Sequence, residues 1–198
     1  MNSKEIPQGS PEWHKARLGC LTASRANDVA AAETTAAHQN YFWKLVAERE
    51  TGLSEDEFVS EAMERGTEME PVARAAYETH TGQFVTQTGF WLHPEIQWFG
   101  ASPDGLVGDD GLIEIKCPKT STHMRYLSEG KVPTKYKRQM ICQLLCTGRK
   151  WVDFVSFDNR VRESKQLFIV RYVPTEKEIK EMLDDVNKFL QKVQEECK

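Results

Sequence analysis

The sequence has few of the features that mark membrane-bound, secreted or zinc-binding proteins. Its five cysteines are odd in number and include no Cys-x-x-Cys pair, which argues against a disulfide scaffold or zinc ribbon and favours a reducing, cytoplasmic setting. No apolar run approaches the roughly 20 residues that a membrane-spanning helix needs, and the first residues lack the apolar core of a secretory signal. We therefore expect a cytoplasmic protein that makes no use of a membrane.

Several catalytic and ligand-binding motifs are also missing. The chain has no Gly-x-x-x-x-Gly-Lys-Ser/Thr, Gly-x-Gly-x-x-Gly or Gly-x-Ser-x-Gly sequence, so nucleotide-binding loops and hydrolase nucleophile elbows lack support. Its histidines show no His-x-x-x-His spacing. Cys142 and Cys146, one helical turn apart, are more typical of a buried helix face than of a metal site.

The composition is that of one packed domain with segregated charge. The chain has 198 residues, of which 39% are apolar and 28% charged, which suits a single domain spanning residues 1–198. A net charge of −4 excludes a uniformly basic DNA-coating protein. Residues 48–70 are rich in acidic side chains and residues 116–138 in basic ones. Such runs are most often solvated faces, but the basic run begins at a candidate catalytic lysine, so we expect it to follow phosphates.

The order of predicted elements indicates an α/β or α+β fold with a central mixed sheet flanked by helices. Periodicity and capping residues predict helices over 11–18, 23–32, 38–51, 61–81, 136–146 and 175–195. Ser60 is the expected cap of the fourth helix, which Gly66 and Pro71 could interrupt. Strands are predicted over 84–92, 98–101, 106–107, 112–116, 151–157 and 166–173. A turn over 108–111 joins two of them in a hairpin.

This hairpin, over about 102–118, carries the strongest candidate site. Glu114 and Lys116 lie two apart on a predicted strand and therefore point to one face, while Ile113 and Ile115 pack behind it. The hairpin can bring Asp104 opposite Glu114. Two carboxylates and a backbone carbonyl make a hard-oxygen site suited to Mg²⁺ or Mn²⁺, and a neighbouring lysine can orient water and stabilise charge on a phosphate. The spacing is that of metal-dependent DNA nucleases.

A second set of residues has the same spacing. The chain contains five Glu-x-Lys triplets, and Asp153 precedes Glu163 by the same interval that separates Asp104 from Glu114. Glu163 lies in a polar stretch without flanking isoleucines, which favours the first set. On spacing alone, that first set could equally be an exposed hairpin with ordinary ion pairs.

Further motifs extend the pattern beyond the triad. In chain order they are Trp13, Arg17-Leu18-Gly19, Thr22-Ala23-Ser24, Gly66…Glu70, Ser102-Pro103-Asp104-Gly105, Glu114-Ile115-Lys116-Cys117-Pro118 and Gln139…Gln143. In these motifs the chain resembles the phage lambda exonuclease and YqaJ-type viral recombinase nucleases, a branch of the PD-(D/E)xK superfamily with its restriction-endonuclease-like fold. The resemblance covers residues 10–158.

The resemblance implies a role for each matching residue. Asp104, Glu114 and the carbonyl of Ile115 would hold two Mg²⁺ ions, which Mn²⁺ could replace. Lys116 would position the attacking water. Glu70 and Gln139 would assist at the same site, and a pocket for the 5′-phosphate of a DNA end would comprise Arg17, Ser24 and Ser102.

The basic run adds candidate DNA contacts: Lys119, Arg125, Lys131, Lys135 and Lys137. The family has an arginine soon after its Lys-Cys-Pro segment. At that place this chain offers His123 or Arg125.

The activity implied by the resemblance is Mg²⁺-dependent 5′→3′ digestion of one strand from a duplex DNA end. This would leave a 3′ single strand for an annealing protein, in phage or prophage recombination in a bacterial host. The resemblance also implies a homotrimeric ring with its basic surfaces inward and the 48–70 region turned away. Two alternatives stay open, a structure-specific endonuclease of the same superfamily and a non-catalytic DNA-end-binding module. The intact Asp104, Glu114 and Lys116 speak against the module.

Overall fold

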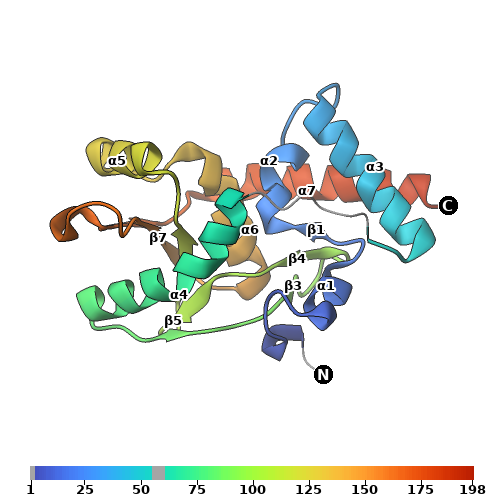
Figure 1. Ribbon diagram of the computed structural model, residues 1–198. Coiled ribbons are helices and arrows are strands. Elements are labelled where there is room, and N and C mark those ends of the chain that lie inside the picture. The colour runs from blue at the N-terminus through green and yellow to red at the C-terminus, as the bar shows by residue number, and fades with distance from the viewer. Residues whose placement is uncertain (1–2, 55–60) are drawn as a thin grey trace.

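The computed structural model describes residues 3–54 and 61–198 (Figure 1). Within these ranges the helices are α1 (Pro11–Arg17), α2 (Ala26–Val29), α3 (Ala36–Thr51), α4 (Glu61–Thr81), α5 (Thr120–Glu129), α6 (Thr134–Thr147) and α7 (Glu176–Glu196). The strands are β1 (Leu21–Thr22), β2 (Val85–Thr86), β3 (Trp91–Leu92), β4 (Phe99–Ala101), β5 (Gly105–Val107), β6 (Gly111–Lys116), β7 (Trp151–Phe157) and β8 (Leu167–Tyr172). Short 3-10 helices cover Ser3–Glu5, Ala23–Arg25 and Glu163–Lys165.

The strands form a large mixed sheet and a small one. The large sheet has the order β2-β5-β6-β7-β8, in which β6 and β7 are parallel and the other pairs antiparallel. Parallel neighbours need a long crossover connection, and here α5 and α6 supply it. The small sheet has the order β1-β4-β3. Because β1 follows α1 in the chain and β4 directly precedes β5, this sheet joins the N-terminal helices to the central hairpin.

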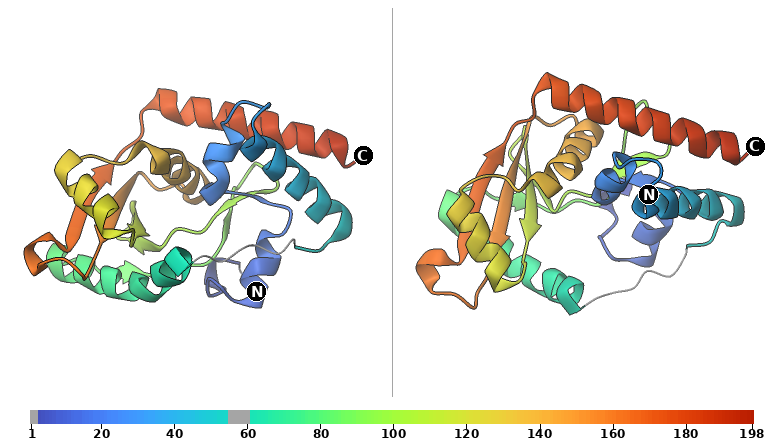
Figure 2. Two further views of the ribbon diagram at one scale, coloured as in Figure 1. Left: turned by 45° about the horizontal axis from the view of Figure 1, so that its top comes forward. Right: turned by 90° about the horizontal axis from the view of Figure 1, so that it is seen from above.

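Two apolar cores enclose the central strand β6. Ile113 and Ile115 belong to one core with Ala73 and Tyr77 of α4. Leu112, from the opposite face of β6, belongs to the other core, together with residues of α2, α3, α6 and α7. The long helix α7 runs along one side of the molecule past both α3 and α6 (Figure 2). β6 is therefore buried on both faces, which fixes its side chains.

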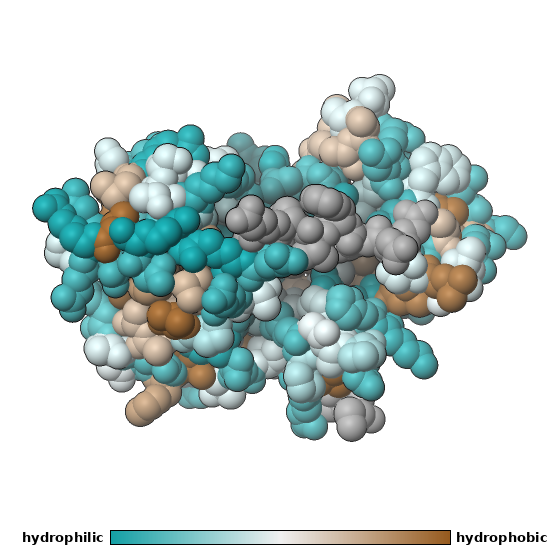
Figure 3. Space-filling view, in the orientation of Figure 1, coloured by the Kyte–Doolittle hydropathy of each residue, from teal (hydrophilic) through white to brown (hydrophobic). Residues whose placement is uncertain are grey.

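The outer surface is mostly hydrophilic, with apolar residues scattered over the face drawn in Figure 3. In the described part of the chain, no helix has the length and apolar character needed to cross a bilayer.

The predicted α/β class and central mixed sheet are confirmed, and most expected elements are found within a few residues of their predicted bounds. The 108–111 turn joins β5 and β6 as expected, and Gly108 adopts the left-handed φ of +52° that favours glycine there. Pro71 lies inside an unbroken α4, so it did not end the helix. The expected cap, Ser60, lies outside the described residues. Cys142 and Cys146 are buried on α6, as predicted.

The prediction of one continuous strand over 84–92 is wrong. The segment instead contributes β2 to the large sheet and β3 to the small one. Between them, the backbone pairs with the N-terminal 3-10 helix. The amides of Gly89 and Phe90 donate to the carbonyls of Lys4 and Ser3, at 2.7 and 2.9 Å. These hydrogen bonds replace a continuous strand ladder.

Two helical expectations also need correction. The helix predicted over 23–32 is a 3-10 turn followed by the short α2, which ends at Val29. Beyond it, a ring nitrogen of His38 lies 3.1 Å from the carbonyl oxygen of Asp28, an acceptor that a longer helix would use. Conversely, α5 was not predicted, because its sequence is polar and only His123 and Tyr126 are buried on it.

Candidate active site

The central hairpin brings the two predicted carboxylates together. Gly105 pairs with Ile113 in the β5–β6 ladder, so the next positions outward are Asp104 and Glu114. Asp104 precedes β5, and its Oδ2 accepts a hydrogen bond of 2.6 Å from the backbone amide of Ile115. This hydrogen bond continues the hairpin by one step and turns the Asp104 carboxylate towards the end of β6.

Glu114 is fully buried, and its carboxylate is held by three side chains. Lys116 forms an ion pair with Oε1, and Nε2 of Gln139 donates to the same oxygen at 2.7 Å. Nε2 of Gln143 donates to Oε2 at 2.5 Å. Gln139 and Gln143 are four residues apart, so they share one face of α6. A buried carboxylate is costly unless it is paired and hydrogen-bonded in this way.

The charges of the site act strongly on one another. Burial, and after it the nearby Glu114 carboxylate, raises the pKa of Asp104 well above its usual range. Burial by itself would lower the pKa of the Lys116 ammonium, but the Glu114 and Asp104 carboxylates outweigh it and raise that pKa. In the metal-free protein the Lys116 ammonium is therefore favoured as a cation and hydrogen-bond donor.

The donor set suits a hard divalent cation. Among the described residues, no group of three His, Cys, Asp or Glu side chains is placed to hold a metal. A cation would thus depend on the Asp104 and Glu114 carboxylates, on carbonyl oxygen such as that of Ile115, and on water. Mg²⁺ binds in this way, through one or two carboxylates and several waters. A cation would also offset the repulsion that raises the pKa of Asp104.

A cleft of about 1190 Å³ runs beside the hairpin. Its lining includes six residues predicted from the sequence: Arg17, Ser24, Glu70, Ser102, Asp104 and Gln139. Glu114 lies behind this lining and is joined to it through Gln139. Residues from α1, α4, α6 and the central hairpin thus converge on one opening.

Part of the acidic 48–70 run faces this cleft, whereas the orientation of the region in the expected ring stays a prediction. Glu48 and Glu70 both line the cleft. Glu48 accepts a hydrogen bond of 2.9 Å from the amide of Gly19, and Glu70 pairs with Arg74 at 2.6 Å. The acidic residues at 55–57 lie outside the described part of the chain. Arg74, with 13% of its side chain exposed, is a cleft residue that sequence reasoning missed.

Two of the three predicted phosphate-pocket residues, Arg17 and Ser102, contact Trp13. The indole Nε1 of Trp13 donates to Oγ of Ser102 at 3.0 Å, and the guanidinium of Arg17 lies 3.8 Å from the centroid of the Trp13 ring. The Ser24 side chain is exposed, and its hydroxyl lies 3.4 Å from that of Thr22. The motif included Trp13, but no sequence pattern indicates that its side chain orients both Arg17 and Ser102.

The five candidate DNA-contact residues lie between the cap of α5 and the start of α6, and none occurs in the described lining of the cleft. Lys119, Arg125 and Lys131 are exposed. Nζ of Lys135 lies 4.7 Å from the centroid of the Tyr136 ring. Lys137 instead pairs with Glu178 of α7 at 3.4 Å, so its charge is already engaged.

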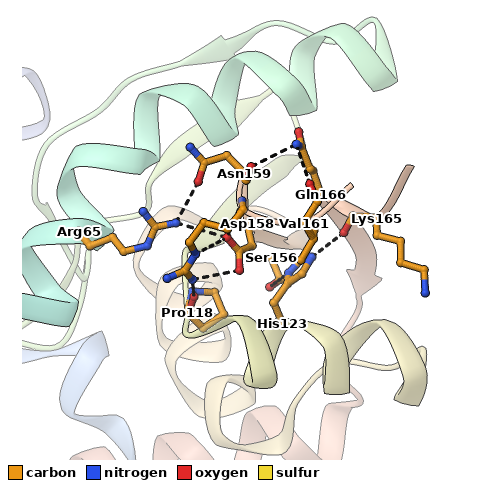
Figure 4. Close-up of polar contacts among 10 residues, drawn as sticks. Arg65, Pro118, His123, Ser156, Asp158, Asn159, Val161, Lys165 and Gln166 are labelled. Carbon is orange, nitrogen blue, oxygen red and sulfur yellow. Dashed lines mark hydrogen bonds and ion pairs between the residues drawn. The ribbon is translucent and has the colours of Figure 1, made fainter. Parts of the chain in front are cut away.

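The segment after Lys116 is held by a cluster of polar contacts (Figure 4). The Arg160 guanidinium donates to both carboxylate oxygens of the fully buried Asp158 and to the Pro118 carbonyl. Arg65 of α4 also pairs with Asp158, at 3.4 Å. These contacts tie the segment to β7 and α4.

His123 belongs to the same region and is fully buried. Its ring nitrogens lie 2.8 Å from Oγ of Ser156 and 2.7 Å from the Lys165 carbonyl (Figure 4). Of the two candidates for the family arginine, only Arg125 is thus open to solvent.

The second set with the same spacing, Asp153 and Glu163, does not form an open site. Asp153 is buried, and it accepts hydrogen bonds from Tyr77 at 2.8 Å and from Arg171 at 2.8 and 2.9 Å. Its carboxylate therefore joins α4, β7 and β8 and is not open to a substrate.

A family model described as a YqaJ-like viral recombinase domain matches residues 12–150 of the chain. The chain belongs to this family. The matched region contains every residue that we assigned to the candidate site.

Solved structures support this placement. The chain is similar to an alkaline exonuclease, LHK-Exo from Laribacter hongkongensis, with 47% identity and a TM-score of 0.89 over 95% of this chain and 94% of that one. A structure of LHK-Exo in complex with dAMP matches equally well. A phage related exonuclease from Haemophilus somnus 129PT shares 14% identity and a TM-score of 0.65, over 90% and 96% of the two chains, and shows the fold alone. No curated protein matches. The family and the LHK-Exo match identify the chain as a nuclease.

Proposed function

We propose that this nuclease is a Mg²⁺-dependent exonuclease that digests one strand of duplex DNA from its 5′ end and leaves a 3′ single strand. The observation that carries the proposal is the cleft that Asp104 and Glu70 share with Arg17, Ser24 and Ser102. A carboxylate site beside an anion pocket suits cleavage close to a terminal phosphate. LHK-Exo, which is an exonuclease, binds dAMP, and a nucleoside monophosphate is what stepwise hydrolysis from a DNA end releases.

Each residue then has a defined task. Arg17, with the hydroxyls of Ser24 and Ser102, would bind the terminal phosphate through charge-assisted hydrogen bonds. This anchoring fixes the next phosphodiester bond beside Asp104, which lowers the entropic part of the barrier. The Asp104 and Glu114 carboxylates and the Ile115 carbonyl would hold Mg²⁺, which when bound stabilises negative charge on the reacting phosphate. The protonated Lys116 donates a hydrogen bond that orients water, and Gln139 holds Glu114 in place.

We further propose that three copies form a ring around the duplex and supply the 3′ strand to a single-strand annealing protein. A net charge of −4 gives one copy little overall attraction to DNA. Lys119, Arg125, Lys131 and Lys135 lie outside the cleft, where they can face duplex DNA that extends beyond the end. The setting that fits this activity is phage or prophage recombination in the bacterial cytoplasm.

Digestion of matched DNA substrates tests the proposal. A linear duplex labelled at either the 5′ or the 3′ end of one strand, and the same DNA as a closed circle, are incubated with and without Mg²⁺. We expect release of the 5′ label as mononucleotide, only with Mg²⁺ and only from linear DNA. Cleavage of the circle would favour the endonuclease, and binding to ends without cleavage would favour the non-catalytic module. Asp104→Asn serves as the control for a contaminating nuclease.

A further inference from the structure

Gln143 is a polar residue in an apolar part of α6. Its side chain is fully buried, between Cys142 and Leu144 in the sequence, both of which are buried as well. Its Nε2 donates the 2.5 Å hydrogen bond to Glu114. Within the described part of the chain, its Oε1 has no hydrogen-bond partner. An unsatisfied buried amide oxygen destabilises a folded protein, so packing alone does not account for a glutamine here.

The two oxygens of Glu114 are held differently. Oε1 is shared by Gln139 and Lys116, both of which are partly exposed. Oε2 is held by Gln143 alone among the described side chains. The terminal torsion of a glutamate is broad, and its carboxylate plane is not fixed by a rotamer preference. A second donor on the other oxygen is what fixes that plane, and Gln143 provides it from a position that substrate does not reach.

We propose that Gln143 is a positioning residue that orients the Glu114 carboxylate for divalent-cation binding. The proposal rests on the proposed function, because it takes Glu114 as a ligand of the cation. Partners that orient a metal ligand from behind typically change metal affinity by about 10- to 100-fold when they are replaced. Gln139 lines the cleft and can also contact substrate, whereas Gln143 can act only through Glu114.

The test is direct Mn²⁺ binding, measured by calorimetry on the whole protein without DNA. Gln143→Met keeps the length of the side chain and removes its donor. We expect about 10- to 100-fold weaker Mn²⁺ binding. The melting temperature should also fall, because the buried Oε2 of Glu114 loses its side-chain donor, so the comparison is made at a temperature where both proteins are fully folded. Cleavage should need more Mg²⁺ for half-maximal rate and recover most of its maximum at saturation. A role in folding alone would not change these cation requirements.

Gln191→Met is the matched control, because Gln191 also donates to a glutamate, Glu195, but on the exposed face of α7. Should Gln143→Met fail to fold, Gln143→Asn shortens the amide and must also weaken Mn²⁺ binding. Asp104→Asn removes a proposed ligand of the cation, so it tests whether the cation site exists independently of Gln143. Wild-type Mn²⁺ affinity in a folded Gln143 variant, together with weaker binding in Asp104→Asn, would overturn the role of Gln143 alone. A wild-type protein that binds no Mn²⁺ would overturn the proposed function as well.

Discussion

The proposed function predicts that the enzyme prefers duplex ends that carry a 5′-phosphate, and that replacing Arg17 with alanine removes this preference. Arg17, Ser24 and Ser102 line the same cleft as Asp104, and the guanidinium of Arg17 lies over the face of Trp13. A second change tests how the pocket is built. Trp13→Phe keeps an aromatic face under Arg17 but removes the indole N–H that donates to Ser102.

The size of each effect follows from the hydrogen bond that the substitution removes. A hydrogen bond to a charged group contributes about 1.5–3 kcal/mol, and about 1.4 kcal/mol corresponds to a tenfold change in rate. Wild type should therefore digest phosphorylated ends about 10- to 150-fold faster than hydroxyl ends, and Arg17→Ala should remove this difference. The Trp13–Ser102 bond joins neutral groups, so removing it costs about 0.5–1.5 kcal/mol. Trp13→Phe should lower the preference by about 2- to 13-fold.

The assay is single-turnover digestion of two duplexes that differ only in the 5′-terminal group of one strand. Arg162→Ala is the control, because Arg162 is an exposed arginine outside the described cleft lining. Equal rates on both ends with wild-type enzyme would refute the pocket. So would an Arg17→Ala variant that is slowed equally on both ends, because that result would indicate a general DNA contact.

Asp104→Asn should slow cleavage by at least about 100-fold, while Glu163→Ala keeps the wild-type rate; an equal decrease in both would mean that the wrong triad was chosen. Hydrogen bonds from Thr175 at the start of α7 lower the pKa of Glu178 to about 2. Because this pKa is depressed in the folded state, the stabilisation is complete above the unfolded value of 4.5 and disappears as pH falls towards 2. Thermal unfolding should show Glu178→Gln less stable than wild type by about 1 kcal/mol at pH 7, and the two equal near pH 2. The double change Lys131→Ala and Lys135→Ala should weaken DNA binding and reduce its log–log salt slope by about 0.9 for each phosphate that is no longer neutralised; an unchanged slope would argue that neither lysine meets DNA.

The hairpin and the long C-terminal helix could be predicted because their signals are local. Alternation over 112–116 and the 108–111 turn define β5 and β6, and Thr175 and Glu178 form the capping box that starts α7. The 84–92 segment could not be predicted, because its partners are the N-terminal 3-10 helix and two different sheets. The signal for α5 was weak for a similar reason, since its amphipathic pattern depends on burial of His123 and Tyr126.

In the candidate site, too, the features set by local sequence could be predicted, and those set by distant parts of the chain could not. The spacing of Asp104, Glu114 and Lys116 could be found in the sequence, because a hairpin register follows from local pattern. The partners that hold Glu114 could not be assigned in this way, because they come from α6 and depend on how that helix packs over β6. Lys137 illustrates the limit. It lies in a basic run, yet its ammonium is turned towards Glu178, on a helix much further along the chain.

In the function that we propose, the Ser102-Pro103-Asp104 segment would link recognition of a DNA end to cleavage. Ser102 belongs to the predicted phosphate pocket and Asp104 to the carboxylate pair, and two residues of chain span at most about 7 Å. Pro103 between them is buried, and its carbonyl accepts a 2.8 Å hydrogen bond from Gln8. This burial and hydrogen bond hold the segment in place in the structure. A terminal phosphate held at Ser102 would place a nearby phosphodiester bond, and not a distant one, beside Asp104. If the pocket binds a terminal phosphate as proposed, this spacing would favour removal of nucleotides from an end over cleavage at internal sites.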